Sequence, residues 1–393
     1  MPDELRALTR LTFEELGLAT GGIGQIHRAI ADRAFGAAGS STPRAIHDAI
    51  AGAVYGGLRA GAGLVGATAS YAVSGTISDS PRGALVLAVL NGLRGDVLER
   101  EGSDLASPME FRVDGLPVAP VDLAVSPRVV VFLHGLFETE HAWGRASYGS
   151  RLADDLDVTP LYVRFNTGRH ISENGRSLAA LLDELVACHD VSQIALVGHS
   201  LGGLVARSAC HAGGDWTALV SHTVSLGSPH TGAPLESAVH YASAALGVVP
   251  ETRPLSGFLR RRSAGIRDLR SGSLVDEDWE GRDPEALRAA ACAEVPLLEG
   301  AAHHFVAATI TRDASHPVGR IFGDWLVLQP SASGRSRARV IGFRAEDGVH
   351  VGGMHHLALL NHPQVYEHLR AWLARAPRAG SPATGPPPRA RAS

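Results

Sequence analysis

Residues 194–203, with the sequence IALVGHSLGG, decide the fold of this chain. The apolar run Ile194 to Val197 is typical of a short buried strand, and it leads directly into Gly198 to Gly202, with Ser200 at the centre. The residues that follow have helical spacing of apolar side chains. A strand, a serine between two glycines and a helix predict a sharp turn that exposes the serine, because side chains two residues away would collide with neighbouring elements.

Ser200 is therefore the candidate nucleophile. The expected helix begins directly after it, so backbone N–H groups and the positive end of the helix dipole would lie near oxygen that becomes negative during reaction. The alternative is a glycine-rich connection between a strand and a helix with no chemical role. The flanking strand and helix favour the functional interpretation.

A second motif, His134 and Gly135, directly follows the apolar run 128–133. Where a serine sits at such a turn, a second backbone donor for the oxyanion comes from the loop after an early strand. We expect the amides of Leu136 and Leu201 to form this oxyanion hole. Alone, the His-Gly pair would indicate only a turn at the end of a strand.

A serine nucleophile of this kind works with a histidine base and with a carboxylate that orients the histidine. The carboxylate should follow a late strand, after the serine in the chain. Three aspartates remain as candidates: Asp313, Asp324 and Asp347. Asp324 is preferred because a glycine precedes it and an apolar run follows it, which predicts a carboxylate buried at a turn. Asp313 closely follows a predicted strand and is the second choice, and each could equally be a solvated turn residue.

The base should precede the last helix, which Pro363 opens. Two histidines, His355 and His356, stand just before it, after a pair of glycines that lets the loop bend over the sheet edge. His356 is preferred, and His355 remains the alternative. The base would accept the proton of Ser200 and return it to the leaving group.

Strands and helices alternate through the middle of the chain. We expect strand-like segments at 109–118, 128–133, 161–165, 194–197, 223–226, 305–310 and 338–343, and helices at 82–101, around 178–186 and from Pro363. Such alternation is typical of a mostly parallel sheet with helices on both faces. With the serine turn, it predicts an α/β-hydrolase fold.

The remaining sequence suggests additions to this domain. Residues 1–105 are rich in alanine and glycine and predict a helical extension, either packed on the main domain or in peripheral contact with a membrane. The hydrolase domain would span 106–377, with a helical cap inserted at about 229–302. The tail, 378–393, has too few apolar residues to form a core and is expected to be disordered.

Composition excludes several function classes. The net charge is −4 and all 36 basic residues are arginine, so nucleic-acid binding is not expected, and neither a lysine Schiff base nor a Walker-type loop can form. Three scattered cysteines make no disulfide framework, and the paired histidines lack further ligands at metal spacing, so we expect no metal and no cofactor. No secretory signal is recognisable at the start, which predicts a cytoplasmic location.

The segments VFLHGL, GHSLGG, SLGSPHTGAPLE, GDWLV and GMHHLALLNHPQVY, within about residues 125–377, resemble bacterial lipase/esterase-type α/β-hydrolases, including the group similar to GPI-inositol deacylases. The resemblance implies Ser200, Asp324 and His356 as the catalytic triad. It does not define the substrate, and residues 1–105 have no counterpart in the common lipases.

Together these features predict a serine hydrolase that cleaves carboxylic esters through an acyl-enzyme on Ser200. The low polarity favours a hydrophobic acyl or alcohol group, lipids included. Two alternatives are an acyltransferase that uses the same residues and a non-catalytic binding module that retains the fold. The number of subunits cannot be inferred from the sequence.

Overall fold

The computed structural model of the chain describes residues 3–11, 76–144, 147–233, 262–284, 291–336 and 339–375. Within these residues, eight strands form one sheet in the spatial order β2-β1-β4-β3-β5-β6-β7-β8. The strands are β1 (Glu110–Val113), β2 (Leu116–Val118), β3 (Arg128–Leu133), β4 (Thr159–Arg164), β5 (Gln193–His199), β6 (Val220–Leu226), β7 (Ala302–Thr309) and β8 (Gly348–Gly352). From β4 to β8 every neighbouring pair in this order is parallel, whereas β1 is antiparallel to both β2 and β4. The predicted α/β architecture with a mostly parallel sheet is confirmed.

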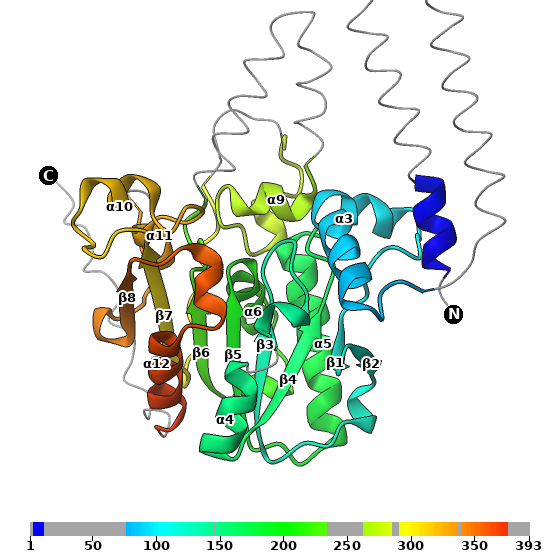
Figure 1. Ribbon diagram of the computed structural model, residues 1–393, viewed down its shortest axis with the longest axis horizontal. Coiled ribbons are helices and arrows are strands. Elements are labelled where there is room, and N and C mark those ends of the chain that lie inside the picture. The colour runs from blue at the N-terminus through cyan, green and yellow to red at the C-terminus, as the bar shows by residue number, and fades with distance from the viewer. Residues whose placement is uncertain are drawn as a thin grey trace, which may run out of the picture.

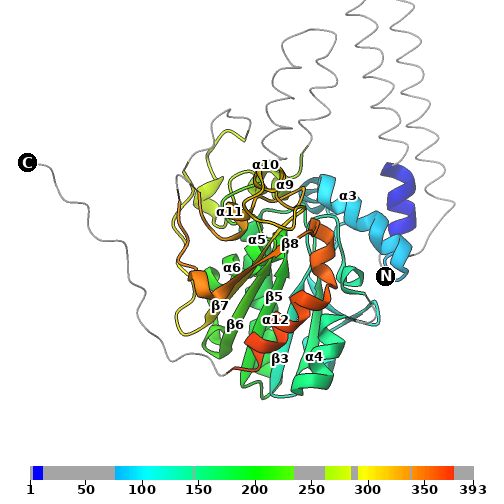
Figure 2. The same cartoon turned by 60° about the vertical axis from the view of Figure 1, so that its left-hand side comes forward.

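Helices cover both faces of the sheet (Figures 1 and 2). One face carries α5 (Ile171–Cys188) and α6 (Leu201–Ala212), and the other carries α4 (Tyr148–Leu156) and α12 (Pro363–Leu373). Shorter helices lie in the connections: α9 (Ala264–Leu269), α10 (Pro317–Phe322), α11 (Gln329–Ala332), and the 3-10 turns η1 (Pro120–Asp122), η2 (Glu140–Trp143), η3 (Asp215–Leu219), η4 (Asp276–Asp278), η5 (Ala345–Asp347) and η6 (His356–Leu360).

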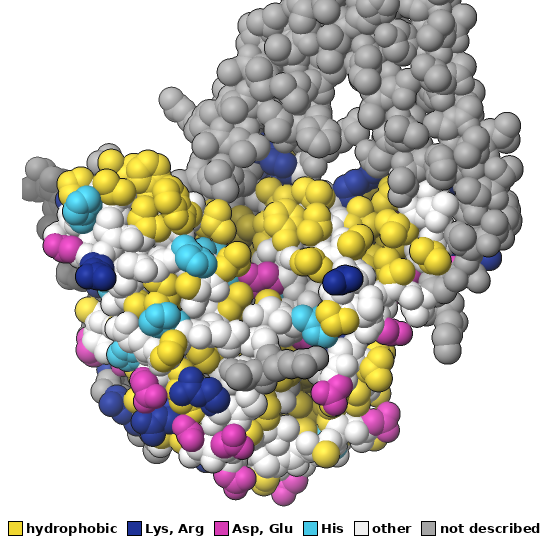
Figure 3. Space-filling model, viewed as in Figure 1, with side chains coloured by type: hydrophobic (Ala, Val, Ile, Leu, Met, Phe, Trp, Pro, Cys, Tyr) yellow, Lys and Arg dark blue, Asp and Glu magenta, His cyan; other side chains and the backbone are white. Residues whose placement is uncertain are grey.

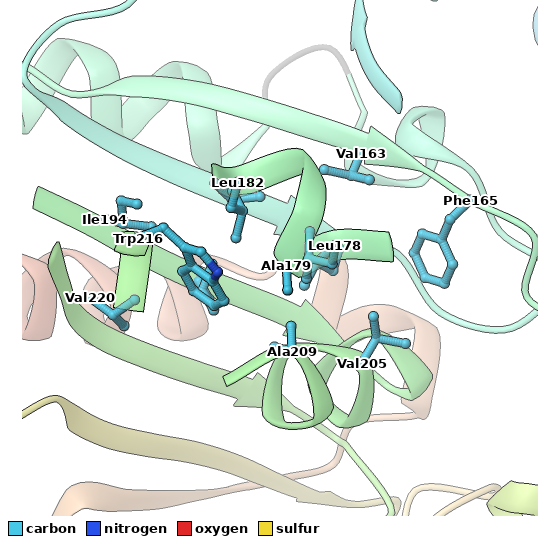
Figure 4. Close-up of a cluster of buried hydrophobic side chains, with 14 of the residues drawn as sticks. Val163, Phe165, Leu178, Ala179, Leu182, Ile194, Val205, Ala209, Trp216 and Val220 are labelled. Atoms are coloured by element: carbon cyan, nitrogen blue, oxygen red, sulfur yellow. The ribbon is translucent and has the colours of Figure 1, made fainter. Parts of the chain in front are cut away.

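The sheet separates two hydrophobic cores. Alternate residues of β3 face opposite cores: Val129 and Val131 pack with α5 and α6, whereas Val130 and Phe132 pack with α4 and α12. A strand that is buried on both sides reads as a continuous apolar run, which is why 128–133 was predictable. Figure 4 shows the first core, where Trp216 is completely buried between the sheet and α5.

An N-terminal helical layer lies at the edge of the sheet where the parallel strands end. Residues 4–11 are helical, and the carboxylate of Glu4 accepts the amides of Ile77 and Ser78 at 2.5 and 2.8 Å, just before α3 (Pro81–Arg100). α3 confirms the helix expected at 82–101. A Cβ atom on Gly92 of α3 would lie 2.2 Å from the ring of Phe137, so this helix packs closely on the turn that follows β3.

The structure corrects three details of the predicted strands. Segment 109–118 is a hairpin of β1 and β2, because Asp114 and Gly115 both have positive φ (52° and 82°) and form a tight turn. Segment 338–343 was wrongly predicted as a strand: among its described residues only Val340 makes an isolated bridge, to Arg335. The strand that pairs with β7 is β8, whose short sequence with a glycine at each end was not recognised as a strand.

Several expectations fall outside the described residues. Residues 12–75, the greater part of the expected helical extension, and the tail, 378–393, lie wholly outside them. Of the expected insertion between β6 and β7, the structure describes 229–233, 262–284 and 291–302, which hold α9 and η4. None of the described helices combines the length and the apolar character needed to cross a membrane.

Candidate functional site

Ser200 lies at the tip of a strained turn between β5 and α6. Its backbone has φ 52° and ψ −120°, a conformation that costs energy for any residue other than glycine and persists only where the surroundings enforce it. Its amide donates to the carbonyl of Leu226 at the end of β6, at 2.9 Å. A Cβ on Gly198 would lie 2.3 Å from the nitrogen of Gly203, and one on Gly202 would lie 2.3 Å from the carbonyl oxygen of Leu133. Both glycines are therefore required by close backbone packing.

The turn after β3, residues 135–138, lies directly against this serine. A Cβ on Gly135 would be 3.0 Å from the Cβ of Ser200, and Phe137 adopts a positive φ of 63°. Leu136 is therefore next to the residue that approaches Ser200. On the other side, Leu201 is the first residue of α6, where backbone amides have no partner within the helix.

His134, at the start of this turn, is held by contacts with Gly135 and Phe165. Burial lowers the pKa of its fully buried ring, which is therefore neutral. Its Nδ1 lies 2.9 Å from the carbonyl of Gly135, and its Nε2 accepts the amide of Phe165 at 3.3 Å. The ring also stacks on Phe165, with centroids 4.3 Å apart. The His-Gly motif thus links the end of β3 to the end of β4.

Asp324 and His356 are joined twice although 32 positions separate them. Nδ1 of His356 lies 2.7 Å from Oδ2 of Asp324, and the His356 amide donates to the Asp324 carbonyl at 2.9 Å. The other carboxylate oxygen of Asp324 accepts the amides of Leu326 and Val327, at 3.0 and 2.8 Å. Both side chains are buried. The carboxylate is held by the tight turn after α10 and can hold the imidazole in one orientation.

The other candidates for acid and base lie elsewhere. Asp313 is exposed, and its carboxylate accepts the amide and the hydroxyl of Ser315, both at 2.8 Å. Asp347 ends η5, directly before β8. His355 is exposed, whereas its neighbour His356 is buried. The structure therefore brings Asp324 and His356 together and leaves these three residues apart from that pair.

His356 lies beside the strand that anchors Ser200. A Cβ on Gly227, the residue after Leu226, would be 3.2 Å from both Nδ1 and Cε1 of His356. The Nε2 atom of His356 is buried and has no hydrogen-bond partner among the described residues. An imidazole whose Nδ1 faces a carboxylate and whose Nε2 is unpaired can accept a proton through Nε2.

Two charged residues of this site were missed from the sequence. His199 precedes the serine, and its Nδ1 lies 2.9 Å from Oε2 of Glu138, in the turn after β3. The same Glu138 oxygen accepts the amide of Gly135 at 2.7 Å. Both residues stand close to motifs that the sequence analysis used, because His199 lies inside the glycine-serine motif and Glu138 lies four residues after His134.

Exposed apolar side chains surround the edge of the sheet that carries these residues. Trp325 follows the acid and Leu357 follows the base, and they are 59% and 56% exposed. Ile321 on α10 is 67% exposed, and one side of α3 exposes Leu85, Val86, Val89 and Leu93. Figure 3 shows hydrophobic side chains gathered over α10 and near α3. We call these seven residues the apolar rim.

The strand order and the serine turn define the fold of esterase- and lipase-type α/β-hydrolases. A family model described as a PGAP1-like alpha/beta domain matches residues 163–252, a segment that includes Ser200. The resemblance inferred from the sequence motifs is thereby confirmed at the level of this hydrolase type.

Solved structures similar to this chain include bacterial lipases and esterases. The mature lipase BlEst2 of Bacillus licheniformis has 17% identity and a TM-score of 0.41, with 62% of this chain and 91% of that chain covered. EstA of Clostridium botulinum has 12% identity and a TM-score of 0.43, with 70% and 93% covered. The carboxylesterase CesB of Bacillus subtilis has 14% identity and a TM-score of 0.34, with 63% and 83% covered.

Proposed function

We propose that this protein is a serine hydrolase that cleaves carboxylic esters, with Ser200, Asp324 and His356 as its catalytic triad. The observation that carries the proposal is the buried pair of Asp324 and His356, whose imidazole lies beside the end of the strand that anchors the strained serine and has an unpaired Nε2. Strain at a partly exposed serine is a reason to seek a chemical role, because folding alone does not favour it.

In the proposed reaction, Oγ of Ser200 attacks the acyl carbonyl while Nε2 of His356 accepts the hydroxyl proton. Asp324 accepts the Nδ1–H, which sets the tautomer and stabilises the imidazolium that forms. The imidazolium then protonates the leaving alcohol, and an acyl-enzyme remains on Ser200. Water, deprotonated by the same imidazole, attacks the acyl carbonyl; the bond to Oγ then breaks, the imidazolium returns its proton to Oγ of Ser200, and the carboxylic acid leaves.

The amides of Leu136 and Leu201 form the proposed oxyanion hole. A Cβ on Gly135 would lie 3.0 Å from that of Ser200, and Leu201 begins α6, so both backbone segments lie next to Ser200. A pair of amides in such a place stabilises the negative charge of the tetrahedral intermediate, and losing one donor typically costs ~10²- to 10³-fold in rate. Since both act through the backbone, truncation of their side chains would not test this role.

The proposed substrate has a hydrophobic acyl or alcohol group. The apolar rim supports this choice, because Trp325 and Leu357 stand directly beside the acid and the base and are exposed. An exposed group of large apolar side chains is typical of a surface that meets an apolar ligand or a lipid surface. The exposed side of α3, a helix of the N-terminal extension, supports our proposal of peripheral membrane contact through that extension.

The experiment combines a fluorophosphonate probe with p-nitrophenyl esters of increasing chain length. We expect the wild-type protein to be labelled and to hydrolyse the esters, and Ser200→Ala to do neither while remaining folded by circular dichroism. Labelling of Ser200→Ala would disprove the assignment of the nucleophile. A folded wild-type protein that neither reacts nor hydrolyses would disprove the function, and ester products formed with added alcohols would instead support acyl transfer.

A further inference from the structure

His199 lies where three parts of the candidate site meet. It is the last residue of β5 and is completely buried. Its Nδ1 lies 2.9 Å from the carboxylate of Glu138, and its Nε2 lies 3.3 Å from the backbone carbonyl of His356. Its ring is tilted against the His356 ring, with centroids 4.7 Å apart. One side chain thus bridges the turn after β3 and the loop of the proposed base.

Both partners of this ring can only accept hydrogen bonds. A carboxylate and a backbone carbonyl have no proton to give, so both bonds form only if both ring nitrogens carry a proton. The ring is then an imidazolium ion. A neutral ring would leave one buried nitrogen facing the lone pairs of an oxygen, which is unfavourable for buried polar groups.

The charges around the ring agree with this protonation state. Burial favours the neutral ring, but the charge of Glu138 and its hydrogen bond outweigh burial and raise the pKa of His199. Burial likewise opposes the charged form of Glu138, yet the charge of His199 and the hydrogen bonds from His199 and Gly135 lower the pKa of that carboxyl. The two residues form a buried ion pair.

We propose that Glu138 and His199 are positioning residues, an ion pair that holds the oxyanion turn and the loop of the base in register with Ser200. Glu138 holds the turn through the amide of Gly135, and His199 holds the carbonyl of the residue whose side chain is the base. The catalytic consequence rests on the proposed function, whereas the ion pair itself does not.

Loss of this pair should affect turnover more than binding. Neither side chain is needed to contact the substrate, so KM should change little. Displacing the oxyanion turn or the imidazole by about 1 Å can reduce the rate ~10²-fold. We therefore expect Glu138→Gln to lower kcat by about that factor.

The pH dependence should report the same ion pair. The titratable groups around His199 are Glu138 and His134 on one side, and Asp324 and His356 on the other. Because the pKa of His199 is raised, the imidazolium persists to higher pH than that of an ordinary histidine and is lost as the pH rises through that raised value. Wild-type kcat should fall over the same range. In Glu138→Gln burial favours the neutral ring, and this decrease should disappear.

The test is NMR of protein with ¹⁵N-labelled histidine, with the His199 signals identified by their absence from His199→Gln. We expect a doubly protonated His199 ring at pH 7 in the wild type and a neutral ring in Glu138→Gln. A neutral ring in the wild type would overturn the inference, whether or not the protein hydrolyses esters. A doubly protonated ring in a protein that no fluorophosphonate labels would instead refute the proposed function.

Kinetics complete the test with matched variants. Glu140→Gln is the control, because Glu140 forms another buried ion pair nearby, with Arg164, at 2.7 Å. It should lower the unfolding temperature but leave kcat and the His199 signals unchanged.

His199→Asn keeps an amide donor near the Nδ1 position and His199→Gln keeps one near the Nε2 position, so each should retain more kcat than His199→Ala. Equal kcat in Glu138→Gln and the wild type would overturn the positioning role.

Discussion

His356 and Asp324 share two hydrogen bonds, one between their side chains at 2.7 Å and one between the His356 amide and the Asp324 carbonyl at 2.9 Å. The backbone bond fixes the distance between the loop that carries Asp324 and the loop that carries His356, which places their side chains within hydrogen-bond distance. A single contact would leave the imidazole free to swing about its side-chain bonds. The backbone bond therefore makes Asp324 both the partner of the ring and the anchor of the loop that carries it.

We predict that Asp324→Asn lowers kcat by about 10⁴-fold while KM changes little, because the amide cannot stabilise the imidazolium and favours the wrong tautomer. The variant retains the size and most hydrogen bonds of the aspartate, so it should fold. Steady-state kinetics on a p-nitrophenyl ester measures the effect. The control is Asp313→Asn, which changes the exposed alternative acid and should retain wild-type kcat; a large loss there would contradict our choice of acid.

Replacing Gly202 by alanine should destabilise the fold by roughly 1–3 kcal/mol, the usual cost of forcing extra atoms into a packed site. The new Cβ would lie 2.3 Å from the carbonyl oxygen of Leu133 and 2.7 Å from that of His134, and backbone atoms cannot move away easily. Urea unfolding measures the change. Gly342→Ala is the matched control, since its Cβ would be 4.0 Å from Leu297, its nearest neighbour. Equal losses in the two variants would show that crowding at the turn with Ser200 is unimportant.

The apolar rim should determine the preference for long acyl chains. We expect Ile321→Asp and Leu357→Asp to reduce kcat/KM for long-chain esters by about tenfold or more per charge, because a charge at an apolar contact loses the free energy of burial. Short-chain esters should be affected much less. Val121→Asp places the same charge on η1, where the side chain is 62% exposed, and serves as the control. Uniform losses across all chain lengths would argue against a binding role for the rim.

Stability should decrease in mild acid because of buried neutral histidines. Burial and the charge of His304 lower the pKa of His222 to about 4, whereas the unfolded chain binds a proton near pH 6.5. The free energy of unfolding therefore keeps its full value above pH 6.5 and decreases as the pH falls toward 4. The loss is about 2 kcal/mol at pH 5.

Urea unfolding at pH 7 and pH 5 measures this loss. His222→Gln should show a smaller decrease between the two pH values than the wild type. His211→Gln removes an exposed histidine near the end of α6 and should behave as the wild type does. If His222→Gln lost as much stability as the wild type, the buried ring would not be the source of the acid sensitivity.

Local features of this protein could be predicted well from the sequence. β3, β5 and α6 follow from apolar runs and from glycines placed around Ser200, since a strand buried on both faces and a tight turn each restrict neighbouring residues strongly. β8 was missed because a strand of five residues with glycine at both ends has little pattern of its own. It forms because β7 offers it an unpaired edge.

By itself, the sequence determined the strand, the turn with Ser200 and the helix, because these depend on contacts between residues a few positions apart. It narrowed the base to His355 and His356 and favoured His356, but His355 remained an alternative because both follow the same glycines. Only the tertiary structure shows that the ring of His356 reaches Asp324 across 32 positions, which supports His356 as the proposed base. It also revealed the pair of Glu138 and His199, since a bond between residues 61 positions apart depends on how β3 and β5 lie side by side, and no local pattern records that.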